Sequence, residues 1–141
     1  MEKQSVLRMI DANLNRLREG IRTAEDICRY IYNDTKLAKE LKTLRHLVRT
    51  SLFEASLMAR DVDRDVLRPT MEIESSRSDI KHIMIAALKR SQESARLLEE
   101  ALKIFDANDA ENFKSIRYRL YATEQEIFTR FFCDKKTEKP R

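Results

Sequence analysis

A run of charged residues near the start of the chain recurs at every third position: Arg16, Glu19, Arg22 and Glu25. On a helix, residues three or four positions apart are surface neighbours. Arginine guanidinium groups form bidentate hydrogen bonds with phosphate oxygens, and carboxylates one turn away orient such arginines or bind Mg²⁺. Phosphoryl transfer needs little beyond positioning, charge neutralisation and a metal ion. The residue types and their spacing therefore favour a phosphate-binding site.

The same residue types return later in the chain at a constant offset. The equivalents of the first four residues are Arg90, Glu93, Arg96 and Glu99. A second block beginning at Lys42 returns at Lys114 with a slightly smaller offset, as a shorter loop in the second copy would produce. A duplication kept only for packing would preserve apolar positions, but these repeated positions are mostly charged. The repeat favours a function for this face, and a solvated face of weak ion pairs is the alternative.

Composition indicates one helical domain. The chain has 141 residues, of which 42% are hydrophobic and 37% charged, with a single glycine, so it is too apolar for a disordered chain. We expect a domain over residues 1–133 and a disordered basic tail over 134–141. The net charge of +4 arises from abundant acids and bases together. This balance suits an anionic ligand and argues against a nucleic-acid partner.

The cellular location of the protein and the redox state of its cysteines are predicted from sequence signals that the chain lacks. The sequence has no apolar run of about 18 residues and does not begin with a basic-then-apolar signal segment, so we expect a cytoplasmic protein that does not span a membrane. Cys28 and Cys133 lie far apart in the sequence without metal-ligand spacing. They are therefore predicted to be reduced thiols.

Apolar residues recur at steps of three and four through most of the chain, the period of an amphipathic helix. The pattern predicts helices over about residues 5–33, 36–58, 79–105 and 110–131. Short connections make successive helices antiparallel neighbours. The predicted fold is all-α, an antiparallel four-helix bundle made of two duplicated hairpins (5–58 and 79–132) joined by a long connector (59–78). The single glycine, Gly20, is predicted either to let a neighbouring backbone or a ligand approach closely or to be a neutral substitution.

The connector contains a weak calcium-loop pattern. Carboxylates occupy its positions 1, 3, 5 and 12, namely Asp61, Asp63, Asp65 and Glu72. The turn position that requires glycine is Val66, and Pro69 lies inside the segment. A link between the hairpins, able to close over a site, is the preferred interpretation.

Several other chemistries are excluded by their missing motifs. There is no glycine-rich phosphate loop, no HExxH and no nucleophile elbow. A di-iron site in a helical bundle requires Glu-x-x-His elements, and neither His46 nor His82 follows a glutamate by three residues. Cys28 falls on the apolar stripe and is interpreted as a packing residue.

Longer motifs in both halves resemble a known family. The first half has the run Asp11–Arg16, then Arg18-Glu19-Gly20, Arg22, Glu25-Asp26 and Arg29; the second has Arg90-x-x-Glu93-x-x-Arg96 and Phe113-Lys114-x-x-Arg117. These motifs resemble the alternative hydroxymethylpyrimidine-phosphate kinase domain of thiamine biosynthesis, often fused ahead of thiamine-phosphate synthase. The resemblance extends over about residues 8–128. It implies phosphorylation of hydroxymethylpyrimidine phosphate to the diphosphate, with ATP and Mg²⁺.

The resemblance implies a role for each group of residues. The implied phosphate ligands are Arg16, Arg22, Arg45, Arg90, Arg96 and Arg117. Glu19, Asp26 and Glu93 are implied to bind Mg²⁺ or to orient the arginines, and Asn13 or Asn15 to contact the pyrimidine. A thiamine-phosphate synthase partner and a homodimer are left open. The alternatives are a non-catalytic helical module that binds a nucleotide or a partner and, ranked last for want of a corrinoid pocket signal, a corrinoid adenosyltransferase-like bundle.

Overall fold

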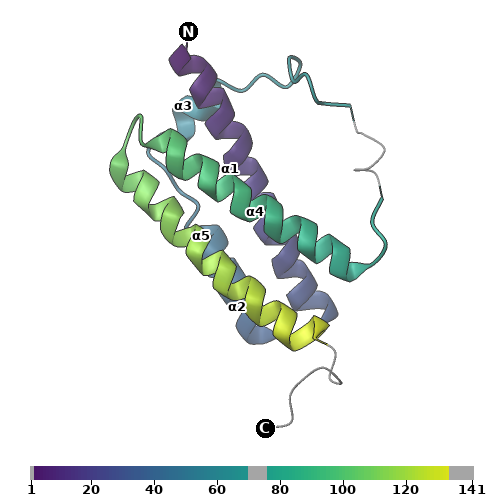
Figure 1. Cartoon of the computed structure of the whole chain (residues 1–141). Coiled ribbons are helices and arrows are strands. Elements are labelled where there is room, and N and C mark those ends of the chain that lie inside the picture. The colour runs from purple at the N-terminus through teal and green to yellow at the C-terminus, as the bar shows by residue number, and fades with distance from the viewer. Residues whose placement is uncertain (1, 70–75, 134–141) are drawn as a thin grey trace.

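The computed structural model describes residues 2–69 and 76–133, and all regular structure in these ranges is helical (Figure 1). The α-helices are α1 (Glu2–Asp26), α2 (Thr35–His46), α3 (Phe53–Met58), α4 (Ile80–Leu102) and α5 (Ala107–Ile127). Short π-helical segments extend α1 (η1, Ile27–Ile31) and α5 (η3, Phe128–Phe132). The all-α prediction is confirmed. The predicted tail and Glu72 lie outside the described residues.

Aspartate side chains cap the starts of three helices. At the start of α2, Asp34 accepts a hydrogen bond from the backbone amide of Leu37. At the start of α4, Asp79 accepts one from the backbone amide of His82, and at the start of α5 Asp106 accepts from two backbone amides. Each carboxylate satisfies an amide that has no partner within its own helix. Side-chain caps therefore fix where these helices begin.

The second predicted helix, 36–58, is wrong as a continuous element, because the chain leaves helical geometry between α2 and α3. Side chains from distant helices bind the backbone of this break. Asn112 donates to the carbonyl of Leu47 at 2.9 Å, and Arg18 donates to the carbonyl of Val48 at 2.9 Å. The Asp109 carboxylate accepts from the backbone amide of Ser51 at 2.9 Å. These contacts replace the hydrogen bonds that a continuous helix would make.

The helices pack in a closed order. α1 contacts α2, α3 and α4, while α5 contacts α4 and α2. In Figure 1, α1 and α4 run side by side in opposite directions. The apolar core between the helices includes the fully buried side chains of Leu17 on α1, Leu88 on α4 and Phe113 on α5. The arrangement as an antiparallel four-helix bundle of duplicated hairpins stays a prediction.

Gly20 lies where α1 crosses α4. A Cβ atom at this position would meet the hydroxyl of Ser91 and would lie 2.8 Å from the carbonyl oxygen of Ala87. The glycine therefore lets the backbone of α4 approach closely, and the predicted close approach of a neighbouring backbone is confirmed.

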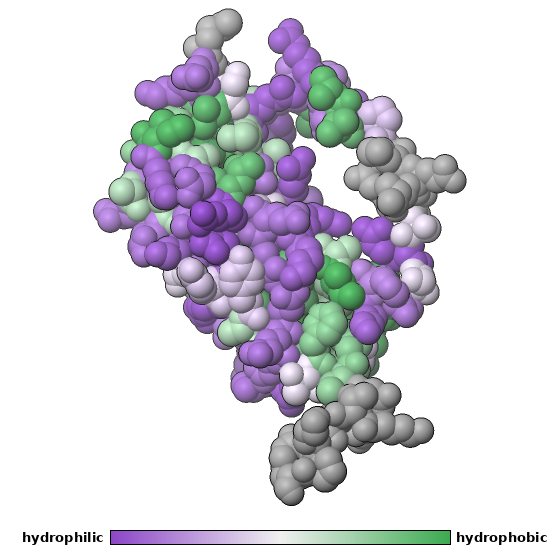
Figure 2. Space-filling model, viewed as in Figure 1, coloured by the Kyte–Doolittle hydropathy of each residue, from purple (hydrophilic) through white to green (hydrophobic). Residues whose placement is uncertain are grey.

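The outer surface is mainly hydrophilic in the view of Figure 2, with smaller hydrophobic patches. Some exposed apolar side chains belong to the connector, including Val66 at 90% and Leu67 at 77% relative exposure. Within the described ranges, none of the helices combines the length and apolar character needed to cross a lipid bilayer.

Candidate functional site

A buried glutamate holds an arginine of the following helix in each half of the chain. Glu25 on α1 accepts from Arg45 Nε at 2.8 Å and from Nη2 at 3.2 Å. Glu99 on α4 accepts from Arg117 Nε at 3.0 Å and from Nη2 at 2.9 Å. Both glutamates are buried, and they are equivalent positions of the repeat. Some of the repeated residues therefore form the same interhelical ion pair in each half of the chain.

The two arginines differ in their surroundings. Arg117 also donates to the hydroxyl of Tyr121 at 3.3 Å and lies over the ring of Tyr118, 4.8 Å from its centroid. The Tyr121 hydrogen bond and the Glu99 ion pair raise the pKa of Arg117, although burial opposes them. The Arg45 side chain is more open, at 19% exposure against 9% for Arg117. Arg45 therefore presents an oriented guanidinium to solvent, whereas Arg117 is enclosed by protein partners.

Arg45 opens into a hollow between α1 and the end of α2, which we call the hairpin hollow. Its volume is about 670 Å³. It is lined by Arg18, Glu19, Arg22, Thr23, Arg45, His46, Val48 and Arg49. Three predicted site residues, Glu19, Arg22 and Arg45, therefore meet here. Four arginines against one lining carboxylate make the hollow suitable for an anion.

Side chains in the hairpin hollow are held to different degrees. Arg18 is fixed by Val48 and lies over the ring of Phe53, and burial lowers its pKa. Arg22 contacts Asp26 at 3.4 Å, with both side chains well exposed, so the pair is weak. The Glu19 carboxylate has no hydrogen bond or ion pair within the described part of the chain. Arg22 and Glu19 are thus available to a ligand.

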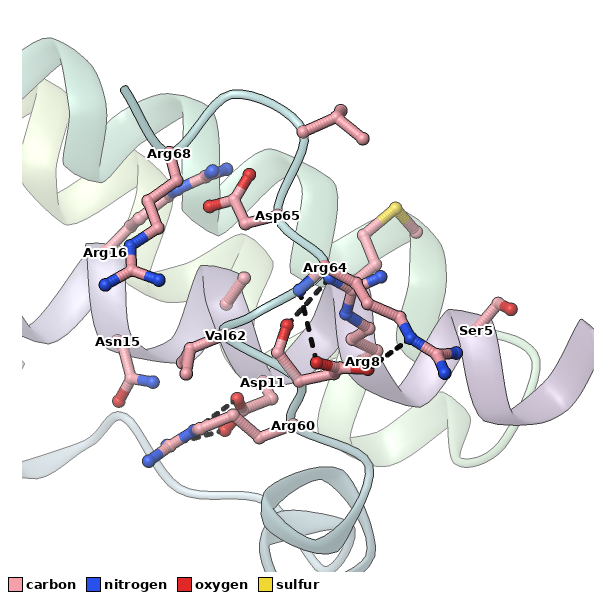
Figure 3. A pocket seen from close by; sticks show the side chains of 14 residues that line it. Ser5, Arg8, Asp11, Asn15, Arg16, Arg60, Val62, Arg64, Asp65 and Arg68 are labelled. Atoms are coloured by element: carbon pink, nitrogen blue, oxygen red, sulfur yellow. Dashed lines mark hydrogen bonds and ion pairs between the residues drawn. The ribbon is translucent and has the colours of Figure 1, made fainter. Parts of the chain in front are cut away.

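A second hollow of about 610 Å³ lies between the outer face of α1 and connector residues 60–68, and we call it the connector hollow (Figure 3). It contains the predicted residues Asn15 and Arg16. Arg60 fastens the connector to α1 through two bonds of 2.7 and 2.8 Å to the buried carboxylate of Asp11. The hydrogen bonds that Arg60 donates to the Asp11 carboxylate raise the pKa of Arg60. Arg8 adds a bond of 2.8 Å to the carbonyl of Asp61.

Two of the connector carboxylates accept hydrogen bonds from backbone amides of the connector. Asp61 accepts from the backbone amide of Arg64 at 3.2 Å, and Asp65 accepts from that of Leu67 at 3.0 Å. Over residues 2–69 and 76–133, no three His, Cys, Asp or Glu side chains gather to hold a metal ion. The turn-forming role of these aspartates accounts for their spacing without calcium.

The remaining predicted residues lie elsewhere. Arg90, Glu93 and Arg96 are exposed on α4 and line neither hollow. The Asn13 side chain is buried and donates to the carbonyl of Met9 in its own helix at 2.9 Å. Of the two predicted asparagines, Asn15 is therefore the one that faces a hollow.

Two groups of site residues were missed from the sequence. Glu25 and Glu99 orient arginines, whereas that role was predicted for other carboxylates; their identity across the repeat was the available signal. The connector arginines Arg60, Arg64 and Arg68 line a hollow, but they have no equivalent in the second half and no helical period. Nothing in the local pattern identified them.

Comparison with known proteins gives a family. Residues 8–126 match the sequence pattern of the ThiD2 family. The chain belongs to the ThiD2 family. The matched residues include both buried ion pairs and the lining of both hollows except Ser5. No solved structure shows significant similarity to the chain.

Curated relatives of this ThiD2 chain include thiamine-phosphate synthases. That of Rhodopirellula baltica is 40% identical over 132 residues, covering 89% of this chain and 35% of the relative. That of a Synechocystis species is 39% identical over 121 residues, covering 85% and 35%. The chain thus spans about a third of the length of the curated relatives that it matches.

Proposed function

We propose that this protein phosphorylates hydroxymethylpyrimidine phosphate to the diphosphate, using ATP and Mg²⁺. Membership of the ThiD2 family and similarity to thiamine-phosphate synthases support a role in thiamine biosynthesis. The observation that carries the kinase proposal is the pair of arginine-lined hollows along one helix, α1. Arg16 of the connector hollow and Arg22 of the hairpin hollow are about 9 Å apart along the helix axis, at roughly 1.5 Å per residue. At about 3.6 residues per turn the two side chains also project about 120° apart around α1, so substrates bound there would lie on neighbouring faces of the same helix.

The hairpin hollow is the proposed site for the ATP phosphates. Arg45 enters it already oriented by the buried Glu25, so little side-chain entropy is lost when the arginine binds a phosphate. Arg22 and Arg49 add positive charge at the rim. Charge neutralisation by fixed cations is the main catalytic contribution in phosphoryl transfer.

Mg²⁺ fits the donor set of the hairpin hollow. Mg²⁺ is commonly held through one or two carboxylates together with substrate phosphates and water. Glu19 supplies a carboxylate without a protein partner among the described residues, and Asp26 is in a weak exposed pair. When bound, the ion would neutralise charge on the transferred phosphate.

The fold proposed for this function is an antiparallel four-helix bundle of two duplicated hairpins, in which the hairpin hollow and the connector hollow both use α1 of the first hairpin. We also propose that the protein acts with a thiamine-phosphate synthase, because the curated relatives carry an equivalent segment within the same chain as that activity. A non-catalytic binding module is the second candidate. It is favoured by the enclosed pair of Arg117 and Glu99, which leaves that arginine without a free face.

Equivalent arginines of the repeat give a matched test. Arg22 lines the hairpin hollow, while Arg96 lies on α4 beside Glu99 and Glu100. We expect Arg22→Ala to lower kcat/KM for ATP by about 10- to 100-fold, as loss of a hydrogen bond to a charged group does, and Arg96→Ala to stay near wild type. Equal loss in both variants would extend the site to the second half. Full activity in Arg22→Ala would remove the hairpin hollow from the proposal.

A further inference from the structure

The far end of the connector hollow contains two arginines that are not held by protein carboxylates at short range. Arg16 has no hydrogen bond or ion pair with any described residue. The carboxylate nearest to Arg68 belongs to Asp63 at 3.8 Å, and both side chains are mostly exposed. In Figure 3 the Arg16 side chain extends from α1 towards the connector and the Arg68 side chain extends from the connector towards α1, and the two cross in the view at one end of the hollow, near Asp65. Arg16 comes from α1 and Arg68 from the connector, so this end of the hollow has one guanidinium group from each of its two walls.

The other three arginines of this hollow have protein partners, and one of them, Arg64, contacts the Asp61 carboxylate at 3.4 Å. Arg60 is bound by the buried Asp11, and Arg8 binds the connector backbone at Asp61. These contacts fix the start of the connector on α1. They leave Arg16 and Arg68 as the pair free to clamp a phosphate from two sides.

The rest of the lining suits a small heterocycle. Met9, Ala12, Val62 and Val66 give apolar surface, and a volume of about 610 Å³ lies in the range of small-molecule sites. Asn15 offers an amide donor and acceptor. Asp65 uses one carboxylate oxygen for the backbone of Leu67, which leaves the other oxygen to accept from an amino group.

We infer that the connector hollow binds the phosphorylated acceptor substrate, an amino-substituted heterocycle carrying a phosphomonoester. Arg16 on α1 and Arg68 on the connector bind the phosphate, and Asp65 with Asn15 binds the ring edge. This inference rests on the proposed function for the identity of the acceptor. It adds binding roles for Arg68 and Asp65, which neither the repeat nor the family resemblance assigned.

Direct titration tests the inference without turnover. Binding of hydroxymethylpyrimidine phosphate, of the unphosphorylated hydroxymethylpyrimidine and of ATP is measured by calorimetry on the full chain. The variants are Arg68→Ala and, as a control that also removes one exposed positive charge but lines neither hollow, Lys81→Ala. We expect Arg68→Ala to weaken binding of the phosphate ester by about 10- to 100-fold. ATP affinity should be unchanged, and Lys81→Ala should match wild type.

The titration separates this inference from the proposed kinase function. If wild type binds the phosphate ester through Arg68 but forms no ADP, the kinase function fails and the assignment of the connector hollow stands. If the protein is an active kinase and Arg68→Ala binds the phosphate ester as wild type does, the assignment is overturned. Loss of ATP affinity in Arg68→Ala would overturn it as well, since the connector hollow would then hold the nucleotide.

Discussion

Arg117 on α5 donates two hydrogen bonds, of 2.9 and 3.0 Å, to a single carboxylate oxygen of Glu99 on α4. Both side chains are less than 10% exposed. A buried arginine and a buried carboxylate each carry a large desolvation penalty, which their mutual contact offsets. The pair therefore joins the last two long helices, and loss of the Glu99 carboxylate leaves the charge of Arg117 uncompensated inside the protein.

We predict that Glu99→Gln lowers the free energy of unfolding by about 3 kcal/mol, because breaking a buried pair costs roughly 3–5 kcal/mol and the amide still accepts one hydrogen bond. Urea denaturation followed by circular dichroism measures the change. The control is Asp26→Asn, whose partner Arg22 is 52% exposed and which should cost less than about 0.5 kcal/mol. Similar losses in both variants would show that burial does not determine the strength of the Glu99 pair.

Gly20→Ala is predicted to destabilise the protein. The new methyl group would meet Ser91 and the carbonyl of Ala87 at the crossing of α1 and α4, and such overpacking costs about 1–3 kcal/mol, more than the roughly 1 kcal/mol gained in helix propensity. The melting temperature of Gly20→Ala should therefore fall, and adding Ser91→Ala should restore part of the loss. A Gly20→Ala variant that melts above wild type would contradict the close packing.

Asp109 gives a prediction for pH. Burial opposes ionisation, but hydrogen bonds from Thr50 and Ser51 outweigh it and lower the pKa of Asp109 below its ordinary value. A carboxylate with a lowered folded-state pKa contributes stability above the unfolded value of about 3.9 and loses it as pH falls through the folded value. Asp109→Asn should therefore be less stable than wild type near neutral pH, and the difference should shrink below about pH 4. Denaturation midpoints over this pH range measure it; a constant difference would contradict the prediction.

The two thiols should differ sharply in reactivity. Burial, with a smaller effect from Asp34, raises the pKa of Cys28 to about 12, while Cys133 is exposed. A buried thiol that stays protonated is inert towards thiol reagents. We expect one fast-reacting thiol per chain with a disulfide reagent near pH 8, abolished by Cys133→Ser, and a second only on unfolding. Fast labelling in Cys133→Ser would contradict the burial of Cys28.

The helices were predictable because their signals are local. Apolar periodicity located α1, α4 and α5. The break between α2 and α3 was missed because Arg18, Asp109 and Asn112, which bind its backbone, are distant in the sequence.

The candidate site was predictable only where the chain repeats itself. The repeat identified Arg22 and Arg45, which meet in the hairpin hollow. The repeat alone did not show that Arg117 would be enclosed while its equivalent Arg45 remains open. The signal was the local difference between the copies, because Tyr118 and Tyr121 follow Arg117 on the same helix where His46 and Arg49 follow Arg45. The connector arginines have neither a repeat nor a period, so only the folded chain brings Arg68 towards Arg16.

The most direct test of the central claim is ADP formation by the purified protein with ATP and Mg²⁺, with and without hydroxymethylpyrimidine phosphate. The account predicts ADP only when the pyrimidine is present, with an equal amount of the pyrimidine diphosphate detected by mass spectrometry. ADP that forms equally without the pyrimidine would indicate simple ATP hydrolysis. Absence of ADP under both conditions, with a thermally stable protein, would contradict the kinase proposal and favour the binding module.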